Sequence, residues 1–175
     1  MSQAKERVLE MCTKALQIEA DGKAFYQRAA EKCHNKLGKE VFSMLMADEE
    51  VHAKRIQMIY DAMKLKESWS DDWKCLVTAN PDLGSFIKIR ATRGEPDPQA
   101  GDVEALDVGL SSEDASINFY KGQLAAAVDP LERAFLNKMV EEESVHYQVL
   151  NDMKFYLTNP AEWFLEKEHS GLDGA

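Results

Sequence analysis

The stretch EADGKAFY, residues 19–26, returns as EDASINFY at residues 113–120, a shift of 94 positions. The same shift, with no gap, carries EEVH at residues 49–52 onto ESVH at residues 143–146. Similarity at one fixed offset within a chain indicates a structural unit that occurs twice. We therefore expect two copies of one supersecondary element, each with a Glu, a Tyr and a Glu-x-x-His pair.

Each copy has the periodicity of two long helices joined by a short turn. Apolar residues recur at helical spacing in four stretches. These predict helices at about residues 3–32, 36–66, 102–128 and 130–157. Asn35 and Asp129 are equivalent in the repeat and are of the types favoured at helix starts, and Pro130 suits a first helical position.

Two further segments lack this pattern. Proline, glycine and tryptophan interrupt residues 67–101, which we interpret as a connector long enough to run the length of a bundle. Pro160 opens a tail over residues 158–175, whose aromatic pair Trp163-Phe164 is expected to pack on a neighbouring surface. The predicted fold class is all-α. It is a four-helix bundle of two repeated hairpins joined by a long crossover, in a single domain spanning residues 1–175.

Composition excludes several classes of partner. The net charge of −10 provides no basic surface for a phosphate backbone, so no nucleic-acid partner is expected. No apolar run is long enough to span a membrane, and the N-terminal residues do not resemble a signal peptide. Three widely separated cysteines fit neither a disulfide framework nor a rubredoxin-like iron site. We expect a cytoplasmic protein without membrane partners.

The spacing Glu-x-x-His is weak evidence by itself in this chain. All four histidines follow a glutamate by three residues, and the chain has 18 glutamates. Only the pairs at 49–52 and 143–146 belong to the repeat, whereas His34 and His169 do not, and these two are interpreted as surface residues. The repeat, rather than the motif, therefore selects the candidate site.

Hairpin geometry gives an independent criterion. In two antiparallel helices, residues whose numbers have a constant sum lie at one level, so Glu19 faces Glu49 if the turn is centred near residue 34. Glu113 faces Glu143 in the same way if the second turn is centred near residue 128. Each histidine lies one turn beyond its glutamate and on the same face. A bundle of the two hairpins then converges six side chains on one layer: Glu19, Glu49, His52, Glu113, Glu143 and His146.

Such a layer requires cations. Carboxylates that share a desolvated core repel one another, and two divalent ions remove that penalty. Carboxylate oxygens with one imidazole per ion suit iron or manganese, with two glutamates bridging. Tyr26 and Tyr120 return to nearly the same face and are predicted to donate hydrogen bonds to ligand carboxylates. The competing interpretation is a metal-free, salt-bridged bundle.

Other carboxylates lie next to the predicted ligands in the sequence. In the acidic run 141–143 only Glu143 is expected to point inward. Asp48 and Glu142 are expected to approach the ligands at most from outside.

The six-residue pattern and the Phe-Tyr pairs resemble the ferritin-like superfamily, and most closely its rubrerythrin-type di-iron domain. The resemblance covers about residues 8–65 and 102–157. Rubrerythrins append a four-cysteine rubredoxin module that this chain lacks. They also place a carboxylate three residues after the third-helix ligand, where this chain has Ser116, and the repeat partner of Ser116 is Gly22.

The resemblance implies a non-haem di-iron oxidoreductase that reduces hydrogen peroxide or dioxygen in an oxidative-stress response. It implies two iron ions, with manganese or a mixed pair as alternatives, and an external electron donor such as a rubredoxin-like protein or a flavoprotein reductase. A homodimer is expected, and helices swapped between its subunits remain open. Two other functions remain open as well: a ferroxidase that handles iron, and a structural module with a structural dimetal site.

Overall fold

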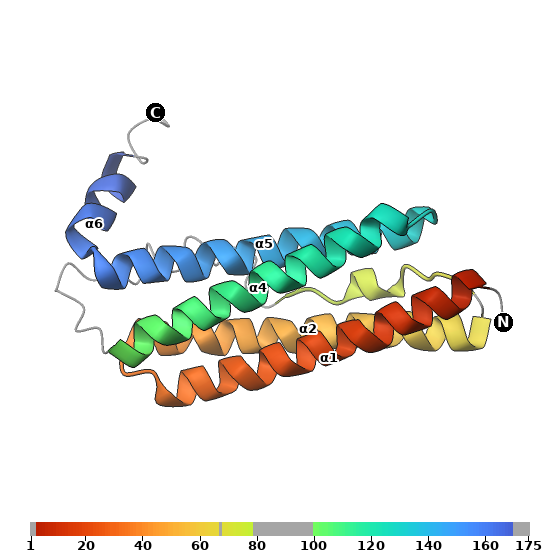
Figure 1. The fold of residues 1–175 in the computed structure, drawn as a ribbon, viewed down its shortest axis with the longest axis horizontal. Helices are drawn as coiled ribbons and strands as arrows, with labels where there is room; N and C mark the ends of the chain where they lie inside the picture. Colours follow the sequence, from red (N-terminus) through yellow and green to blue (C-terminus); the bar gives the residue numbers. More distant parts are fainter. Residues whose placement is uncertain (1–2, 67, 79–99, 170–175) are drawn as a thin grey trace.

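The computed structural model describes residues 3–66, 68–78 and 100–169 (Figure 1). All regular structure in these ranges is helical, as the all-α prediction requires. The elements are α1 (Gln3–Lys32), α2 (Lys36–Lys66), a short 3-10 helix η1 (Asp72–Cys75), α4 (Ala100–Ala126), α5 (Pro130–Thr158) and α6 (Pro160–His169).

The four long helices form two antiparallel hairpins, α1 with α2 and α4 with α5, that pack side by side (Figure 1). Across the pair, α1 contacts α4 and α2 contacts α5. The two helices that carry the Glu-x-x-His pairs, α2 and α5, are therefore neighbours, and so are α1 and α4. The four helices therefore surround one central layer, to which both hairpins contribute side chains.

Local hydrogen bonds fix where the second helix of each hairpin begins. The Asn35 side chain accepts from the Gly38 amide at 3.0 Å. Asp129 caps α5 by accepting from the amides of Leu131 and Glu132 at 2.7 and 3.3 Å. Both residues thus supply the acceptors that a helix N-terminus needs, as the repeat suggested.

Helix α4 is displaced from its predicted bounds of 102–128. It begins at Ala100 and ends at Ala126, where the Ala127 amide turns back to the Leu124 carbonyl at 3.3 Å. Arg133 of α5 then donates to the carbonyls of Leu124 and Ala127 at 3.2 and 3.0 Å. A side chain from the next helix satisfies the last carbonyls, so α4 stops two residues early.

A buried aspartate joins the two hairpins at one end of the bundle. Asp102, 3% exposed on the first turn of α4, accepts from the amides of His34 and Asn35 at 3.0 and 3.1 Å. These amides lie in the α1–α2 turn and have no helical partner of their own. The His34 side chain itself is 68% exposed, in agreement with the surface position predicted for it.

The apolar core consists of two clusters separated along the bundle axis. One lies toward the α1–α2 turn and includes Tyr26, Leu45, Leu150 and Trp163. The other lies toward the opposite end and includes Met11, Ile59, Tyr120 and Leu136. Between these clusters lies the layer that contains the predicted site.

The prediction that residues 158–175 form a tail without helical structure is wrong for residues 160–169, which form α6. Proline is compatible with the first turn of a helix, where no amide hydrogen bond is lost. Trp163 is 1% exposed, packs on Tyr156 with ring centres 5.3 Å apart, and donates to Asp152 at 3.0 Å. The aromatic pair does pack on a neighbouring helix. Residues 170–175 and the His169 side chain lie outside the description.

The described part of the connector, residues 68–78, runs back along the bundle from the end of α2 (Figure 1). Trp73 packs edge-on against Phe135 of α5, with ring centres 5.4 Å apart. Arg55 of α2 donates to the Leu76 carbonyl from Nε and Nη2, at 3.0 and 2.7 Å. The segment is thus fixed to both α2 and α5. Residues 79–99 of the predicted connector lie outside the described residues.

Replacing Asp102 with alanine tests the joint between the hairpins. Two amides lose their acceptor, so the free energy of unfolding in urea should fall by about 2 kcal/mol. The matched control is Asp107→Ala on the same helix, whose side chain is 53% exposed and pairs with Lys154. An exposed ion pair contributes less than about 1 kcal/mol. Equal effects of the two substitutions would contradict the structural role of Asp102.

Candidate metal centre

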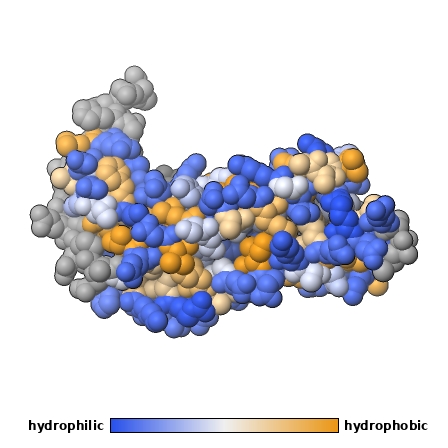
Figure 2. All heavy atoms as spheres, in the orientation of Figure 1, coloured by the Kyte–Doolittle hydropathy of each residue, from blue (hydrophilic) through white to orange (hydrophobic). Residues whose placement is uncertain are grey.

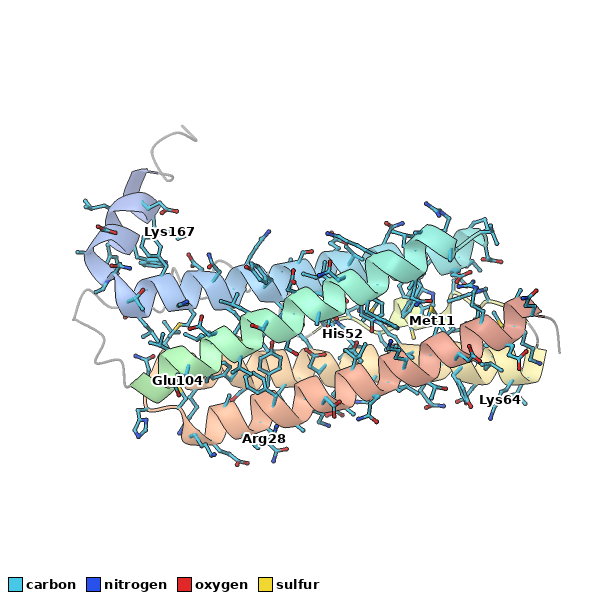
Figure 3. The ribbon with its side chains drawn as sticks, in the orientation of Figure 1. Met11, Arg28, His52, Lys64, Glu104 and Lys167 are labelled. Atoms are coloured by element: carbon cyan, nitrogen blue, oxygen red, sulfur yellow. The ribbon has the colours of Figure 1, made fainter. Side chains whose placement is uncertain are left out.

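The structure brings all six predicted ligands into one layer near the middle of the bundle, where Figure 3 labels His52. Each of the six is at most 4% exposed. They fall into two sets whose ligand atoms lie within 4.8 Å of one another. One set is Glu19, Glu49, His52 and Glu143, and the other is Glu49, Glu113, Glu143 and His146. Glu49 and Glu143 belong to both sets, as expected of bridging carboxylates.

The two tyrosines tie the hairpins together through this layer. Tyr26 of α1 donates its hydroxyl hydrogen to Glu113 Oε1 of α4, and Tyr120 of α4 donates to Glu19 Oε1 of α1. Each tyrosine is therefore bonded to the glutamate of the other hairpin. This exchange fixes one oxygen of each non-shared carboxylate and leaves the other oxygen, Oε2, for a second partner.

Both imidazoles direct Nδ1 toward the carboxylates and Nε2 outward. His52 Nδ1 lies 3.2 Å from Glu19 Oε2, and its Nε2 lies 3.1 Å from Glu142 Oε2. In the other half, His146 Nε2 lies 3.4 Å from Asp48 Oδ2. Asp48 and Glu142 are equivalent in the repeat and orient the two rings in the same way. Both approach the ligands from outside, as expected, and Glu142 is itself buried, at 8% exposed.

Sequence reasoning did not identify Arg55, which is 2% exposed and extends this arrangement. Its Nη1 donates to Glu142 Oε2, the oxygen that contacts His52, while its other nitrogens bind the Leu76 carbonyl. One guanidinium therefore connects the connector segment to an imidazole of the site. The sequence points to Arg55 only through its position one helical turn after His52. The repeat gives no support for a role of Arg55, because the equivalent residue is Val149.

Three buried polar atoms of the layer make no hydrogen bond: Glu143 Oε1, Glu143 Oε2 and His146 Nδ1. They lie in ion-pair contacts instead, with His52 Nδ1 3.2 Å from Glu143 Oε1 and His146 Nδ1 3.4 Å from Glu143 Oε2. Divalent cations would satisfy these carboxylate oxygens and the imidazole nitrogen at once. The described residues of the layer contain no thiolate, and the oxygen-rich donors are those that iron and manganese accept. The residues present therefore fit a pair of such ions.

Gly22 and Ser116 occupy the repeat positions where the two halves differ near the ligands. A Cβ atom on Gly22 would lie 3.3 Å from Cδ of Glu49, so the absence of a side chain leaves room for that carboxylate. Ser116 is 7% exposed on α4, one turn beyond Glu113. Neither position supplies a seventh carboxylate, in contrast to the pattern that the resemblance implies for rubrerythrins proper.

The carboxylates cannot all ionise together in this layer. Burial, together with the charges of Glu19 and Glu143, raises the pKa of Glu49 well above its usual value. Burial and the Glu143 charge raise the pKa of Glu113 to about 7. Burial acts on Glu143 in the same sense, but the two imidazoles outweigh it and hold the pKa of Glu143 below its usual range. The layer thus retains protons that cations would displace.

The hydrogen-bond donors around the carboxylates stay protonated. Burial alone would lower the pKa of His52 and of His146, but the surrounding carboxylates raise both well above the usual value. Burial and neighbouring carboxylates also raise the pKa of Tyr26 and of Tyr120, so both hydroxyls remain donors at neutral pH. Burial opposes ionisation of Glu142, yet His52 and Arg55 lower its pKa to about 2.

A helical bundle with two overlapping Glu₃His sets at its centre is the architecture of a ferritin-like protein of the di-iron class. The family comparison agrees. The rubrerythrin family model matches residues 10–154, which include both hairpins, and the chain belongs to this family. Neither the curated proteins nor the solved structures gave a match. Among the described residues, no helix is long and apolar enough to cross a membrane.

The pKa shifts predict how metal-stripped protein responds to pH. A carboxyl whose pKa rises from 4.5 to about 7 on folding stabilises the fold below pH 4.5, and that contribution is lost as pH rises toward 7 and above. The raised histidines act in the same direction. For Glu113 alone the loss is roughly 3 kcal/mol. The melting temperature of chelator-treated protein should therefore fall between pH 5 and pH 8.

Two controls accompany this measurement. Glu113→Gln removes the titrating carboxyl and should flatten the decline. Added Fe²⁺ or Mn²⁺ should restore stability at pH 8, because the ions replace the protons. Below pH 4.5 the opposite trend is expected, since Glu142 and Glu143 have lowered pKa values. A melting temperature that rises steadily from pH 5 to 8 without metal would contradict the assigned shifts.

Proposed function

We propose that this chain is a di-iron redox protein that reduces hydrogen peroxide with electrons from an external donor. The observation that supports it most is the pair of overlapping ligand sets, which share Glu49 and Glu143. In this proposal those two glutamates would be shared by the ions. Glu19 and His52 would help to hold one ion, and Glu113 and His146 would help to hold the other. The ligand assignment and the choice of iron over manganese are both part of the proposal.

The ions would supply two electrons and polarise the oxygen–oxygen bond of the oxidant. The chain's own residues perform the remaining tasks. Tyr26 and Tyr120 hold the outer carboxylates in place through their hydroxyls. The apolar clusters on both sides of the layer exclude water along the bundle axis, which strengthens electrostatic interactions inside it.

We propose that another protein supplies the electrons. The cysteines of the described residues are single and separate, and two of them, Cys12 and Cys33, are buried with raised pKa values of about 12 and 11. These thiols are not poised to carry electrons. The family suggests a rubredoxin-like protein or a flavoprotein reductase as the donor. We further propose a single domain, a homodimer and a cytoplasmic location.

Metal stoichiometry tests the ligand assignment. Wild-type protein should bind two ions per chain, and Glu143→Gln should bind both far more weakly, by about 10- to 100-fold or more, because the shared carboxylate is lost. Glu19→Gln should affect chiefly one ion. The matched control is Glu141→Gln, two residues away on the exposed face of α5. Elemental analysis after gel filtration reports the counts, and equal binding by all four proteins would refute the assignment.

Peroxide consumption tests the reaction. Protein loaded with Fe²⁺ without oxygen should consume about one hydrogen peroxide per two irons in a single turnover, because each ion gives one electron. Glu49→Ala should abolish this reaction. Glu50→Ala, a change at the next residue, whose carboxylate pairs with Lys23 and Lys54 at the surface, should retain it. Iron uptake into a large assembly on size exclusion would favour a ferroxidase, and stable metal without peroxide consumption would favour a structural site.

A further inference from the structure

Arg55 is a cation that the fold removes from water. Hydrophilic residues cover much of the face formed by α1 and α4, which is in view in Figure 2. Arg55 lies instead where α2 meets α5, and only 2% of it is exposed. Burying a charged side chain is unfavourable unless partners satisfy it. The partners of this guanidinium therefore indicate what it does.

Three nitrogens of the guanidinium donate hydrogen bonds, and they serve two acceptors. Nε and Nη2 donate to the Leu76 carbonyl at 3.0 and 2.7 Å, and Nη1 donates to Glu142 Oε2. The same oxygen of Glu142 lies 3.1 Å from Nε2 of His52. The connector thus fixes one edge of the guanidinium, and the guanidinium holds the Glu142 carboxylate against the outer nitrogen of the imidazole. A carboxylate at that nitrogen orients the ring and directs Nδ1 toward the other carboxylates.

Lys138 also contacts Glu142, but in a different way. Its Nζ lies 3.4 Å from Glu142 Oε1, which is not the oxygen that contacts His52, and 3.4 Å from Glu141 Oε2. The Lys138 side chain is 40% exposed, and exposed ion pairs contribute little. Arg55 is therefore the cation that holds Glu142 in contact with the imidazole.

The other half of the repeat has no arginine at this position. The equivalent residue is Val149, which is 2% exposed and belongs to the apolar core. His146 has an outer carboxylate of its own, because Asp48 Oδ2 lies 3.4 Å from its Nε2. A valine side chain donates no hydrogen bond to that carboxylate. The two imidazoles are thus equivalent in the repeat, but a guanidinium supports only one of them.

We propose that Arg55 is a positioning residue for one of the two ions, the one beside His52. The inference rests on the ligand assignment in the proposed function. Through Glu142, Arg55 keeps the His52 ring in the orientation that presents Nδ1 to its ion. The ion beside His146 does not depend on Arg55. The repeat therefore supplies two similar ligand sets, and this arginine makes them unequal in how tightly each retains its ion.

Binding of Mn²⁺ tests the proposal without any redox reaction. The full chain is titrated with Mn²⁺ in competition with a chelator of known affinity, which gives a dissociation constant for each ion. Loss of an outer partner of a metal-binding imidazole weakens the metal by about 10- to 100-fold. Arg55→Gln should therefore raise one constant about tenfold and change the other less than about twofold. Unchanged constants, or equal increases in both, would overturn the proposal.

Anomalous scattering at the manganese edge identifies the weakened ion. Crystals of Arg55→Gln are equilibrated at an Mn²⁺ concentration between the two constants of this variant. The anomalous peak should be strong beside His146 and weak beside His52. The opposite occupancy would contradict the proposal.

Two control variants separate positioning from a general effect on the fold. Arg133→Gln also removes a guanidinium that donates to two carbonyls, but these lie at the end of α4, away from the ligands. Lys138→Gln removes the exposed cation near Glu142. Each control should leave both Mn²⁺ constants within about twofold of the wild-type values. An increase of about tenfold in either control would show that the effect is not specific to Arg55 and would overturn the proposal.

A double-mutant cycle tests whether Arg55 acts through Glu142. Glu142→Gln keeps the size of the side chain and removes its charge, and it should itself weaken the ion beside His52 about tenfold. In the Glu142→Gln protein, Arg55→Gln should add less than about twofold, because the connection is already lost. A further loss of about tenfold would mean that the arginine acts independently of this carboxylate, against the proposal.

A second variant keeps the test decisive if Arg55→Gln does not fold. Arg55→Lys retains the charge, but an ammonium does not reproduce the fork that joins Leu76 and Glu142, so about fivefold weaker binding of one ion is expected. Mn²⁺ constants that do not respond to Arg55→Lys would overturn this inference alone. Failure of the iron-loaded wild type to consume hydrogen peroxide would overturn the proposed reaction alone. Absence of Mn²⁺ binding would overturn the ligand assignment and this inference together.

Discussion

Four carboxylates buried together in one layer of the bundle are the constraint on which this structure depends. An isolated buried charge costs several kcal/mol, and like charges in one layer add to that cost. Two imidazoles, two tyrosine hydroxyls and retained protons offset part of it. The oxygens of Glu143 lie 3.2 and 3.4 Å from the two imidazole Nδ1 atoms but make no hydrogen bond. The layer is therefore built for cations, and the apolar clusters on either side supply the burial energy that holds it together.

Much of this arrangement could be predicted from the sequence, because the repeat and the pairing of levels in an antiparallel hairpin both depend only on residue types and numbers. The shift of 94 residues selected two Glu-x-x-His pairs out of four, and hairpin geometry placed Glu19 opposite Glu49. The starts of two helices could also be predicted, since Asn35 and Asp129 accept hydrogen bonds from amides no more than three residues away. The all-α fold and the family follow from these local regularities, and the structure and the family model agree with them.

The features that sequence reasoning missed depend on contacts between distant residues. Arg55 binds Leu76, 21 positions away, and Glu142, 87 positions away. Neither partner is suggested by periodicity, and the repeat partner Val149 is apolar. The buried Glu132 is similar: it reads as part of a helix start, yet its carboxylate accepts from Arg7 at 2.5 Å across the bundle. Pairings of this kind require the tertiary structure.

The same topology explains why the surroundings of a symmetric site differ from one side to the other. Helix α2 ends at the opposite end of the bundle from the start of α4, so the connector must return along the bundle length (Figure 1). Residues 73–78 do so over α2 and α5, the helices that carry both histidines. Helix α5 is followed instead by α6, which packs at its end. The duplication thus makes the ligands equivalent, while the single crossover adds Trp73 to the α2–α5 side and supplies the Leu76 carbonyl that holds Arg55 of α2.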